Sequence, residues 1–215
     1  MKNSVDIIAH RGLWLKESEQ NSIESLTQAI KSGYGVETDI RDLDGKIVIS
    51  HDLPNKKNIL LSSFLEIYQS LNSFNGFKPS IAINIKSDGL HEKLVDLIDR
   101  FDVNNYFVFD MSIPDTLKYI NLKLNTFIRI SEYEIYPRKL KGIKGVWIDQ
   151  FKKQWFTIDE ISKHLIEGRD VCIVSSELHG RDEHELWKNI KHSSFDGRIM
   201  ICTDKPRKAE QYFNG

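Results

Sequence analysis

Two pairs of residues in the first quarter of the chain have the types needed for acid–base and metal chemistry. His10 and His51 each follow an apolar run, and a histidine can take up or release a proton near neutral pH. Glu37 and Asp39 are two residues apart in a predicted strand, so both carboxylates point to one face. Two such carboxylates repel each other unless a cation or a proton lies between them. Hard divalent ions such as Mg²⁺ or Ca²⁺ prefer oxygen ligands, so a divalent ion between the two carboxylates is expected. Spacing alone leaves open an outward-facing carboxylate in a salt bridge.

These side chains need a scaffold that brings strand ends together. Eight short β-branched or aromatic runs read as buried strands. They are Val5–Ala9, Gly35–Ile40, Ile81–Lys86, Tyr106–Asp110, Thr126–Ser131, Gly145–Asp149, Val171–Ser176 and Arg198–Thr203. Helical patterns lie between them, which predicts a compact (β/α)8 TIM barrel with its active site at the carboxyl ends of the strands. An open doubly wound sheet is the alternative fold.

Local signals place several boundaries within this alternation. Asn21 and Glu24 fit a capping box at the start of a helix, and Thr157 and Glu160 fit a second one. The dipeptide Asp44–Gly45 is a strong tight-turn signal. Because Ile47–Ser50 follows it, we expect a short β-hairpin after the second strand, with His51 at its end.

Length and composition favour one ordinary globular domain spanning residues 1–215. The 30 basic and 31 acidic residues leave a formal charge of -1, so no overall field attracts nucleic acid or an anionic membrane. The chain has no apolar run of transmembrane length and no secretion signal, which predicts a cytoplasmic protein acting on a small molecule. Cys172 and Cys202 lie in predicted strands and are expected to be buried thiols.

The order and spacing of several short motifs resemble the glycerophosphodiester phosphodiesterase family, a branch of the phospholipase-C-like phosphodiesterases. In this sequence the motifs read His10-Arg11-Gly12, Gln20-Asn21-Ser22, Glu37-Thr38-Asp39, Asp44-Gly45, His51-Asp52 and, near the end, Thr203-Asp204-Lys205-Pro206. The dense part of the resemblance covers about residues 5 to 54. The match is that of a divergent member.

The resemblance implies a phosphoric diester hydrolase that cleaves a glycerophosphodiester or a related polar phosphodiester. His10 and His51 would be the general acid and base, with their order left open. A divalent ion, Mg²⁺ or Ca²⁺, would be held by Glu37 and Asp39. Arg11 would bind a phosphoryl oxygen through its fork of donors, as would Lys86 through its point charge.

The chain departs from the family pattern inside this centre. Gln20 stands where the family has a glutamate, and Asn84 replaces a third metal carboxylate. Asn84 can still offer a neutral carbonyl oxygen, and Asp110 is expected to compensate as a further metal ligand. After the seventh strand, Glu177 and His179 are candidates for reading a polar head group, although a solvated loop is an equal alternative.

Two other functions fit parts of the pattern. A barrel with a weakened metal site could bind a phosphorylated ligand without turnover, although a binder does not need two histidines as an acid/base pair. A lyase with Lys86 as its base would not have histidine motifs on both sides of Glu-x-Asp. The histidines outside the motifs at positions 91, 164, 184 and 192 are expected to be solvated.

Overall fold

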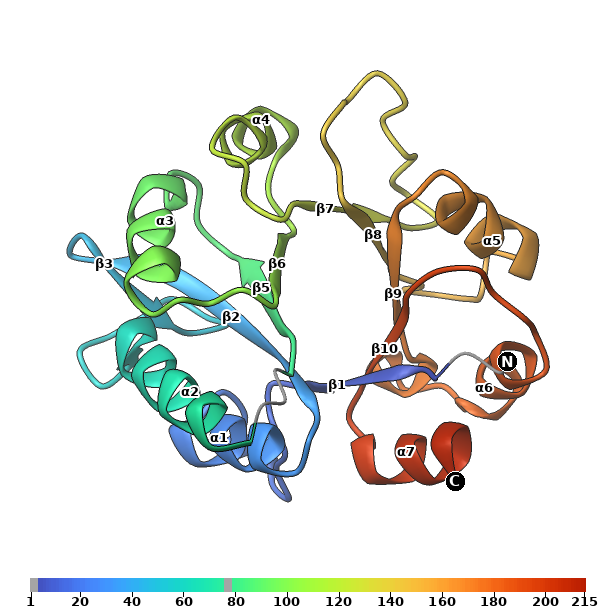
Figure 1. The fold of residues 1–215 in the computed structure, drawn as a ribbon, viewed down its shortest axis with the longest axis horizontal. Coiled ribbons are helices and arrows are strands. Elements are labelled where there is room, and N and C mark those ends of the chain that lie inside the picture. Colours follow the sequence, from blue (N-terminus) through green and yellow to red (C-terminus); the bar gives the residue numbers. More distant parts are fainter. Residues whose placement is uncertain (1–3, 76–78) are drawn as a thin grey trace. The chain divides into compact units, whose positions relative to one another are not determined.

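The structure is a computed structural model that describes residues 4–75 and 79–215 (Figure 1). Contacts between Cα atoms divide the chain into two compact units. One unit is Ala9–Thr126, and the other is Phe127–Gly215 together with the chain up to Ile8. The first strand, β1 (Asp6–His10), runs from one unit into the other.

The unit formed by Ala9–Thr126 contains parallel strands, an antiparallel hairpin extension and helices. Its elements are η1 (Glu17–Glu19), α1 (Ile23–Lys31), β2 (Gly35–Leu43), β3 (Lys46–Ile49), β4 (Ile59–Leu60), α2 (Leu61–Asn75), β5 (Ile81–Ile85), α3 (His91–Arg100), β6 (Tyr106–Phe109) and α4 (Ile113–Asn121). β2, β5 and β6 pair in parallel, with Asp39 opposite Asn84. Helices α1 and α2 pack against each other within this unit (Figure 1).

The predicted hairpin is present. β2 and β3 pair antiparallel around Asp44 and Gly45, whose φ angles of 51° and 78° are both positive. A two-residue turn with two positive φ angles matches the twist of a hairpin, which explains the choice of Asp-Gly. β3 then pairs with β4, and the loop between them, residues 50–58, contains His51.

The first helix begins differently from the capping-box prediction. Ser22, not Asn21, is its N-cap, and the Ser22 side chain accepts a hydrogen bond from the backbone N–H of Ser25. Asn21 has a left-handed φ of 58°, and its side chain bonds to β2 instead. A long-range partner has therefore replaced the local cap.

The other unit also alternates parallel strands with helices. Its elements are β7 (Phe127–Ile130), β8 (Gly145–Ile148), α5 (Ile158–Ile166), β9 (Asp170–Val174), η2 (Ser176–His179), α6 (His184–Lys191), β10 (Ile199–Thr203) and α7 (Pro206–Asn214). β7, β8, β9 and β10 pair in parallel in that order. The Thr157 cap is confirmed, because its side chain accepts from the N–H of Glu160. Residues 131–144, between β7 and β8, form no helix.

All eight predicted strands are present, and their apolar residues form the core. Among the described residues, β5 and β10 are buried along their whole length. Cys172 and Cys202 are buried and free, as expected. The expectation of a solvated His164 is wrong: its side chain is buried between Tyr136 and Arg169. No helix in the described residues is long and apolar enough to cross a membrane.

Candidate active site

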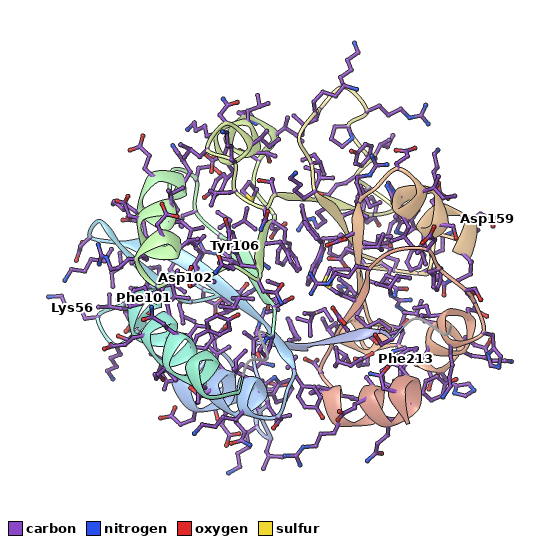
Figure 2. All side chains as sticks on the ribbon, viewed as in Figure 1. Lys56, Phe101, Asp102, Tyr106, Asp159 and Phe213 are labelled. Carbon is purple, nitrogen blue, oxygen red and sulfur yellow. The ribbon has the colours of Figure 1, made fainter. Side chains whose placement is uncertain are left out.

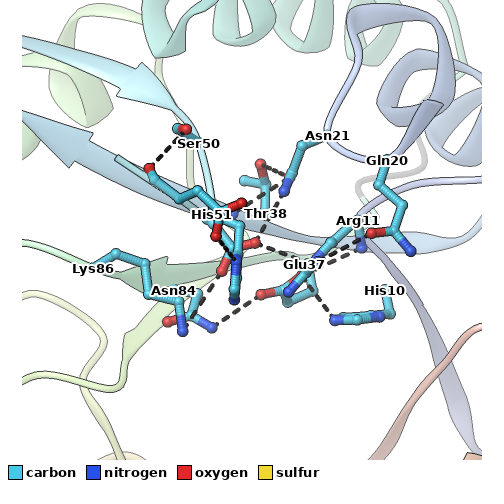
Figure 3. A network of polar contacts seen from close by, with 12 residues as sticks. His10, Arg11, Gln20, Asn21, Glu37, Thr38, Ser50, His51, Asn84 and Lys86 are labelled. Carbon is cyan, nitrogen blue, oxygen red and sulfur yellow. Dashed lines mark hydrogen bonds and ion pairs between the residues drawn. The ribbon is translucent and has the colours of Figure 1, made fainter. Parts of the chain in front are cut away.

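The polar centre lies where β2 and β5 run side by side. Glu37 and Asp39 on β2 are 1% and 0% exposed, and Asn84 on β5 is 8% exposed. Asp39 and Asn84 are register partners on the two strands, and the side chains of Glu37 and Asn84 point toward each other (Figure 3). Asn84 Nδ2 donates a hydrogen bond to Glu37 Oε1 over 3.1 Å. The expectation that Glu37 and Asp39 share one face with Asn84 beside them therefore agrees with the geometry.

Burial has a large effect on Glu37. Loss of solvent, reinforced by the nearby charge of Asp39, raises the pKa of Glu37 to about 7. His10, Arg11 and Lys86 act in the opposite direction but do not cancel the effect. A carboxylate in this position is costly to ionise unless a further cation is present.

Asp39 is held by two cations and an amide. Arg11 Nε lies 3.1 Å from Asp39 Oδ2, and Asn21 Nδ2 donates to the same oxygen over 2.9 Å. Lys86 Nζ is 3.7 Å from the other oxygen, Oδ1. Within the described part of the chain, Asp39 Oδ1 is buried without a hydrogen-bond partner, as is Asn84 Oδ1. Buried polar atoms normally have partners, so these two oxygens have unused capacity to bind a ligand.

Asn21 is the positioning residue that sequence reasoning missed. Besides its bond to Asp39, Asn21 Oδ1 accepts from the hydroxyl of Thr38 over 2.8 Å, and its backbone N–H donates to the carbonyl of Arg11 over 2.9 Å. It thereby ties the loop after β1 to β2. The motif Gln20-Asn21-Ser22 contained the signal, but its position before a helix favoured the capping interpretation.

The backbone after β1 is strained in the way that functional loops often are. Arg11 has a left-handed φ of 55°, and Gly12 has a φ of +94° where a Cβ would lie 2.6 Å from the backbone carbon of Ser25. This bend lets the N–H of Arg11 donate to Glu37 Oε2 over 3.3 Å. The Arg11 guanidinium also donates from Nη1 to Gln20 Oε1 over 3.0 Å, so Gln20 holds it without adding charge.

The two histidines sit in different surroundings. His10 Nε2 is 3.9 Å from Glu37 Oε2, and the His10 side chain is 18% exposed. His51 is 46% exposed, and its Nδ1 lies 2.8 Å from Asp52 Oδ1. A partner on Nδ1 fixes the orientation of the imidazole ring, so that Nε2 points away from that partner. Arg41 Nε donates to the backbone carbonyl of His51 over 2.9 Å, which anchors the loop that carries it.

Lys86 links Asp110 to the centre. Its Nζ is 2.8 Å from Asp110 Oδ2, and Asp110 has a left-handed φ of 75° directly after β6. The Asp110 carboxylate thus contacts Lys86 next to the centre. A role for Asp110 as a metal ligand stays a prediction.

The donor set fits a divalent ion of the oxygen-seeking kind. Glu37, Asp39 and Asn84 supply two carboxylates and an amide carbonyl, and both orphaned oxygens belong to this set. A divalent cation between them would relieve the repulsion that raises the Glu37 pKa. The described residues contain no group of three or more His, Cys, Asp or Glu that could hold a metal; the third oxygen donor in this set is the amide of Asn84.

Glu177 and His179 belong to the other unit, and their contacts there are internal. The Glu177 carboxylate accepts from the hydroxyls of Ser175 and Thr203 and from the N–H of Asp204. His179 Nε2 lies 2.7 Å from Asp149 Oδ1, and its ring packs edge-on to Phe151. Glu177 thus ties the end of β9 to the end of β10. A role for either residue in reading a substrate stays a prediction.

Comparison with known proteins gives likeness at the level of structure. No protein-family model matches the chain, and no curated protein matches it in sequence. Among solved structures, a phosphodiesterase from Oleispira antarctica in complex with the product sn-glycerol-3-phosphate is 16% identical, with a TM-score of 0.70 over 99% of this chain and 98% of that one. A glycerophosphoryl diester phosphodiesterase from Parabacteroides distasonis is 15% identical, with a TM-score of 0.66 over 99% and 87%.

A tryptophan synthase α-subunit from Pyrococcus furiosus is less similar, at 12% identity and a TM-score of 0.54 over 99% of this chain and 96% of that one. The (β/α)8 prediction is thereby confirmed as the fold class. The resemblance drawn from the short motifs agrees with the neighbours found by structure: this chain has the fold of glycerophosphodiester phosphodiesterases, at low sequence identity.

Proposed function

We propose that this protein is a metal-dependent phosphodiesterase that cleaves a glycerophosphodiester or a related polar phosphodiester. The observation that carries the proposal is the buried cluster of Glu37, Asp39 and Asn84, with two unpartnered oxygens, set beside Arg11 and Lys86. A phosphodiester needs both charge neutralisation and proton transfer. The cluster and its neighbours contain groups for each task.

Charge decides how the substrate is held. Three carboxylates, Glu37, Asp39 and Asp110, face the cations Arg11 and Lys86, which leaves one negative charge when all are ionised. A divalent ion on Glu37, Asp39 and Asn84 would reverse that sign and attract a diester anion. When bound, Mg²⁺ or Ca²⁺ would supply Lewis-acid stabilisation of the phosphoryl oxygens. Arg11, steadied by Gln20, would orient one of those oxygens.

The histidines then divide the proton transfers. The attacking oxygen forms a bond to phosphorus and gives its proton to His10. The bond from phosphorus to the departing alcohol breaks, the electron pair stays on the alcohol oxygen, and His51 supplies the proton. We assign His51 to the leaving group because it is the more exposed histidine and lines an open pocket, whereas His10 lies beside the buried Glu37.

Two further expectations belong to the same proposal. The physiological substrate is a small molecule, not nucleic acid or membrane lipid, because the chain carries almost no net charge. We also propose that the protein works in the cytoplasm.

Turnover of glycerophosphodiesters with Mg²⁺, Ca²⁺, Mn²⁺ or EDTA tests the proposal. We expect metal-dependent hydrolysis that falls by ~10²–10⁴-fold in His10→Ala and in His51→Ala. His184→Ala is the matched control, since His184 is exposed and lies in the other unit. Its activity should equal that of the parent.

The binding-only alternative draws on the neutral Asn84 in place of a carboxylate. It predicts that glycerol phosphate binds to the parent, while no glycerophosphodiester is hydrolysed with any of the metals. That result, or activity that survives both histidine substitutions within a few-fold, would rule out the enzymatic proposal.

A further inference from the structure

An open pocket of about 410 Å³ adjoins the candidate active site within the same unit. It shares Arg11 and His51 with that site, while the metal-binding cluster itself does not line it. The pocket therefore begins where the phosphoryl group would sit and extends away from the metal. Its lining includes Glu17 of η1, and Asn55 and Lys57 of the loop between β3 and β4.

The loop wall is held in place by its own amides. Asn58 Oδ1 accepts from the N–H of Asn55 over 2.7 Å, and Asn58 Nδ2 donates to the carbonyl of Ile49 over 3.0 Å. Asn55 Oδ1 accepts from the N–H of Lys57 over 3.0 Å. Side-chain bonds of this kind to nearby backbone fix a turn without a strand or helix. The pocket wall is therefore preorganised, which lowers the entropic cost of binding.

Several polar groups on the pocket have no partner among the described residues. Gln20 uses Oε1 to accept from Arg11, so its Nε2 is a free donor, and Asn55 Nδ2 is another. The ammonium of Lys57 and the carboxylate of Glu17 likewise have no partner in the part of the chain that the structure describes. Donors and acceptors are both present, and the charged lining residues are two cations, Arg11 and Lys57, and two carboxylates, Glu17 and Asp52.

We propose that this pocket receives the departing alcohol of the phosphodiester, and that this alcohol carries hydroxyl groups and no net charge. The inference rests on the proposed function, since it takes the phosphoryl group to lie at Arg11. A hydroxyl can both donate and accept, so it can pair with Glu17 and with Lys57 or Gln20. An alkyl group would make none of these hydrogen bonds, so it would bind more weakly. A cation or an anion would meet both attracting and repelling charges on this lining.

Two substrates that differ only in hydroxyl groups test this inference. Glycerophosphoglycerol carries two hydroxyls on its departing half, and the propyl ester of glycerol phosphate lacks those two. The measurement is kcat/KM for both, with the double variant Glu17→Ala, Lys57→Ala beside the parent. We expect the parent to prefer the hydroxylated substrate by about tenfold or more, and the double variant to prefer it by less than about threefold.

Lys56→Ala is the matched control. Lys56 is exposed (Figure 2), as Lys57 is, but it does not line the pocket, so this variant should keep the parent's preference. Thermal unfolding of each variant checks that it is folded, as expected for exposed positions. Equal kcat/KM for both substrates in the parent, or a preference unchanged in the double variant, would overturn the pocket inference while the phosphodiesterase stands. Absence of turnover with either substrate would instead overturn the proposed function and the pocket inference with it.

Discussion

Replacing Glu37 with glutamine should stabilise the metal-free protein at alkaline pH. In the folded state the pKa of Glu37 is raised from 4.5 to about 7, whereas in the unfolded chain it returns to its ordinary value. Between these values the folded protein holds a proton that the unfolded chain has released, so stability is lost as pH rises through this range. Each pKa unit corresponds to ~1.4 kcal/mol. The loss specific to Glu37 is therefore about 3 kcal/mol between pH 4.5 and pH 7.

Glutamine has the same shape and no charge. In Glu37→Gln the new amide can donate to Asn84 Oδ1, which lacks a partner in the described structure, once the Asn84 amide turns over. We expect the difference in unfolding free energy between Glu37→Gln and parent to shift by about 3 kcal/mol in favour of the variant between pH 4.5 and pH 8. Mg²⁺ or Ca²⁺ at pH 8 should stabilise the parent and leave the variant unchanged.

Urea unfolding in EDTA at the two pH values measures this difference. Glu24→Gln is the control, because Glu24 is exposed on α1, and its difference from the parent should not vary with pH by more than a few tenths of a kcal/mol. A Glu37→Gln difference that stays constant with pH, or that favours the parent more at pH 8, would refute the account of Glu37 as a buried, destabilised carboxylate.

Three further outcomes follow from other parts of the structure. The turnover of His51→Ala should fall by ~10²–10⁴-fold on a glycerol ester but by less than tenfold on a 4-nitrophenyl ester, whose leaving group needs no proton. His10→Ala should lose activity on both esters. Equal losses on the two esters in His51→Ala would contradict the assignment of His51 as the general acid. Burial, and secondarily the charge of Arg169, lowers the pKa of His164 to about 4. The stability that the neutral His164 confers is therefore complete above pH 6.5 and is lost as pH falls toward 4. The unfolding free energy of His164→Gln should depend less on pH than that of the parent in this window. Gly12→Ala should cost about 3 kcal/mol, measured by denaturant unfolding, because of its φ of +94° and the 2.6 Å approach to Ser25; a melting curve like the parent's would contradict that crowding.

The strands were predictable because a buried parallel strand has a short, nearly continuous run of apolar residues in the sequence. The hairpin was predictable because Asp44 and Gly45 are residues that tolerate two successive positive φ angles. Glu37 and Asp39 were placed on one face by strand periodicity alone. In each case the information lies within a few adjacent residues.

What escaped prediction depends on partners far away in the sequence. Asn21 looks like a helix cap, yet it bonds to Thr38 and Asp39, which lie 17 and 18 residues further on. His164 sits in a polar stretch, but packing against Tyr136 and Arg169 buries it. Residues 131–144 form no helix between two strands. No local pattern reveals such choices, because they are decided by tertiary contacts.

The proposed cation site can form only when β2 and β5 pair in the correct register. Asp39 and Asn84 are direct partners in the parallel ladder, although 44 positions of chain separate them. A slip of one residue in either strand would turn that strand's polar side chains to the opposite face. A chain with the wrong register could still be compact and rich in β-structure, yet it would have no cluster to hold a cation. Recovery of cation binding during refolding would thus count the molecules with correct strand alignment, which optical measures of secondary structure cannot distinguish.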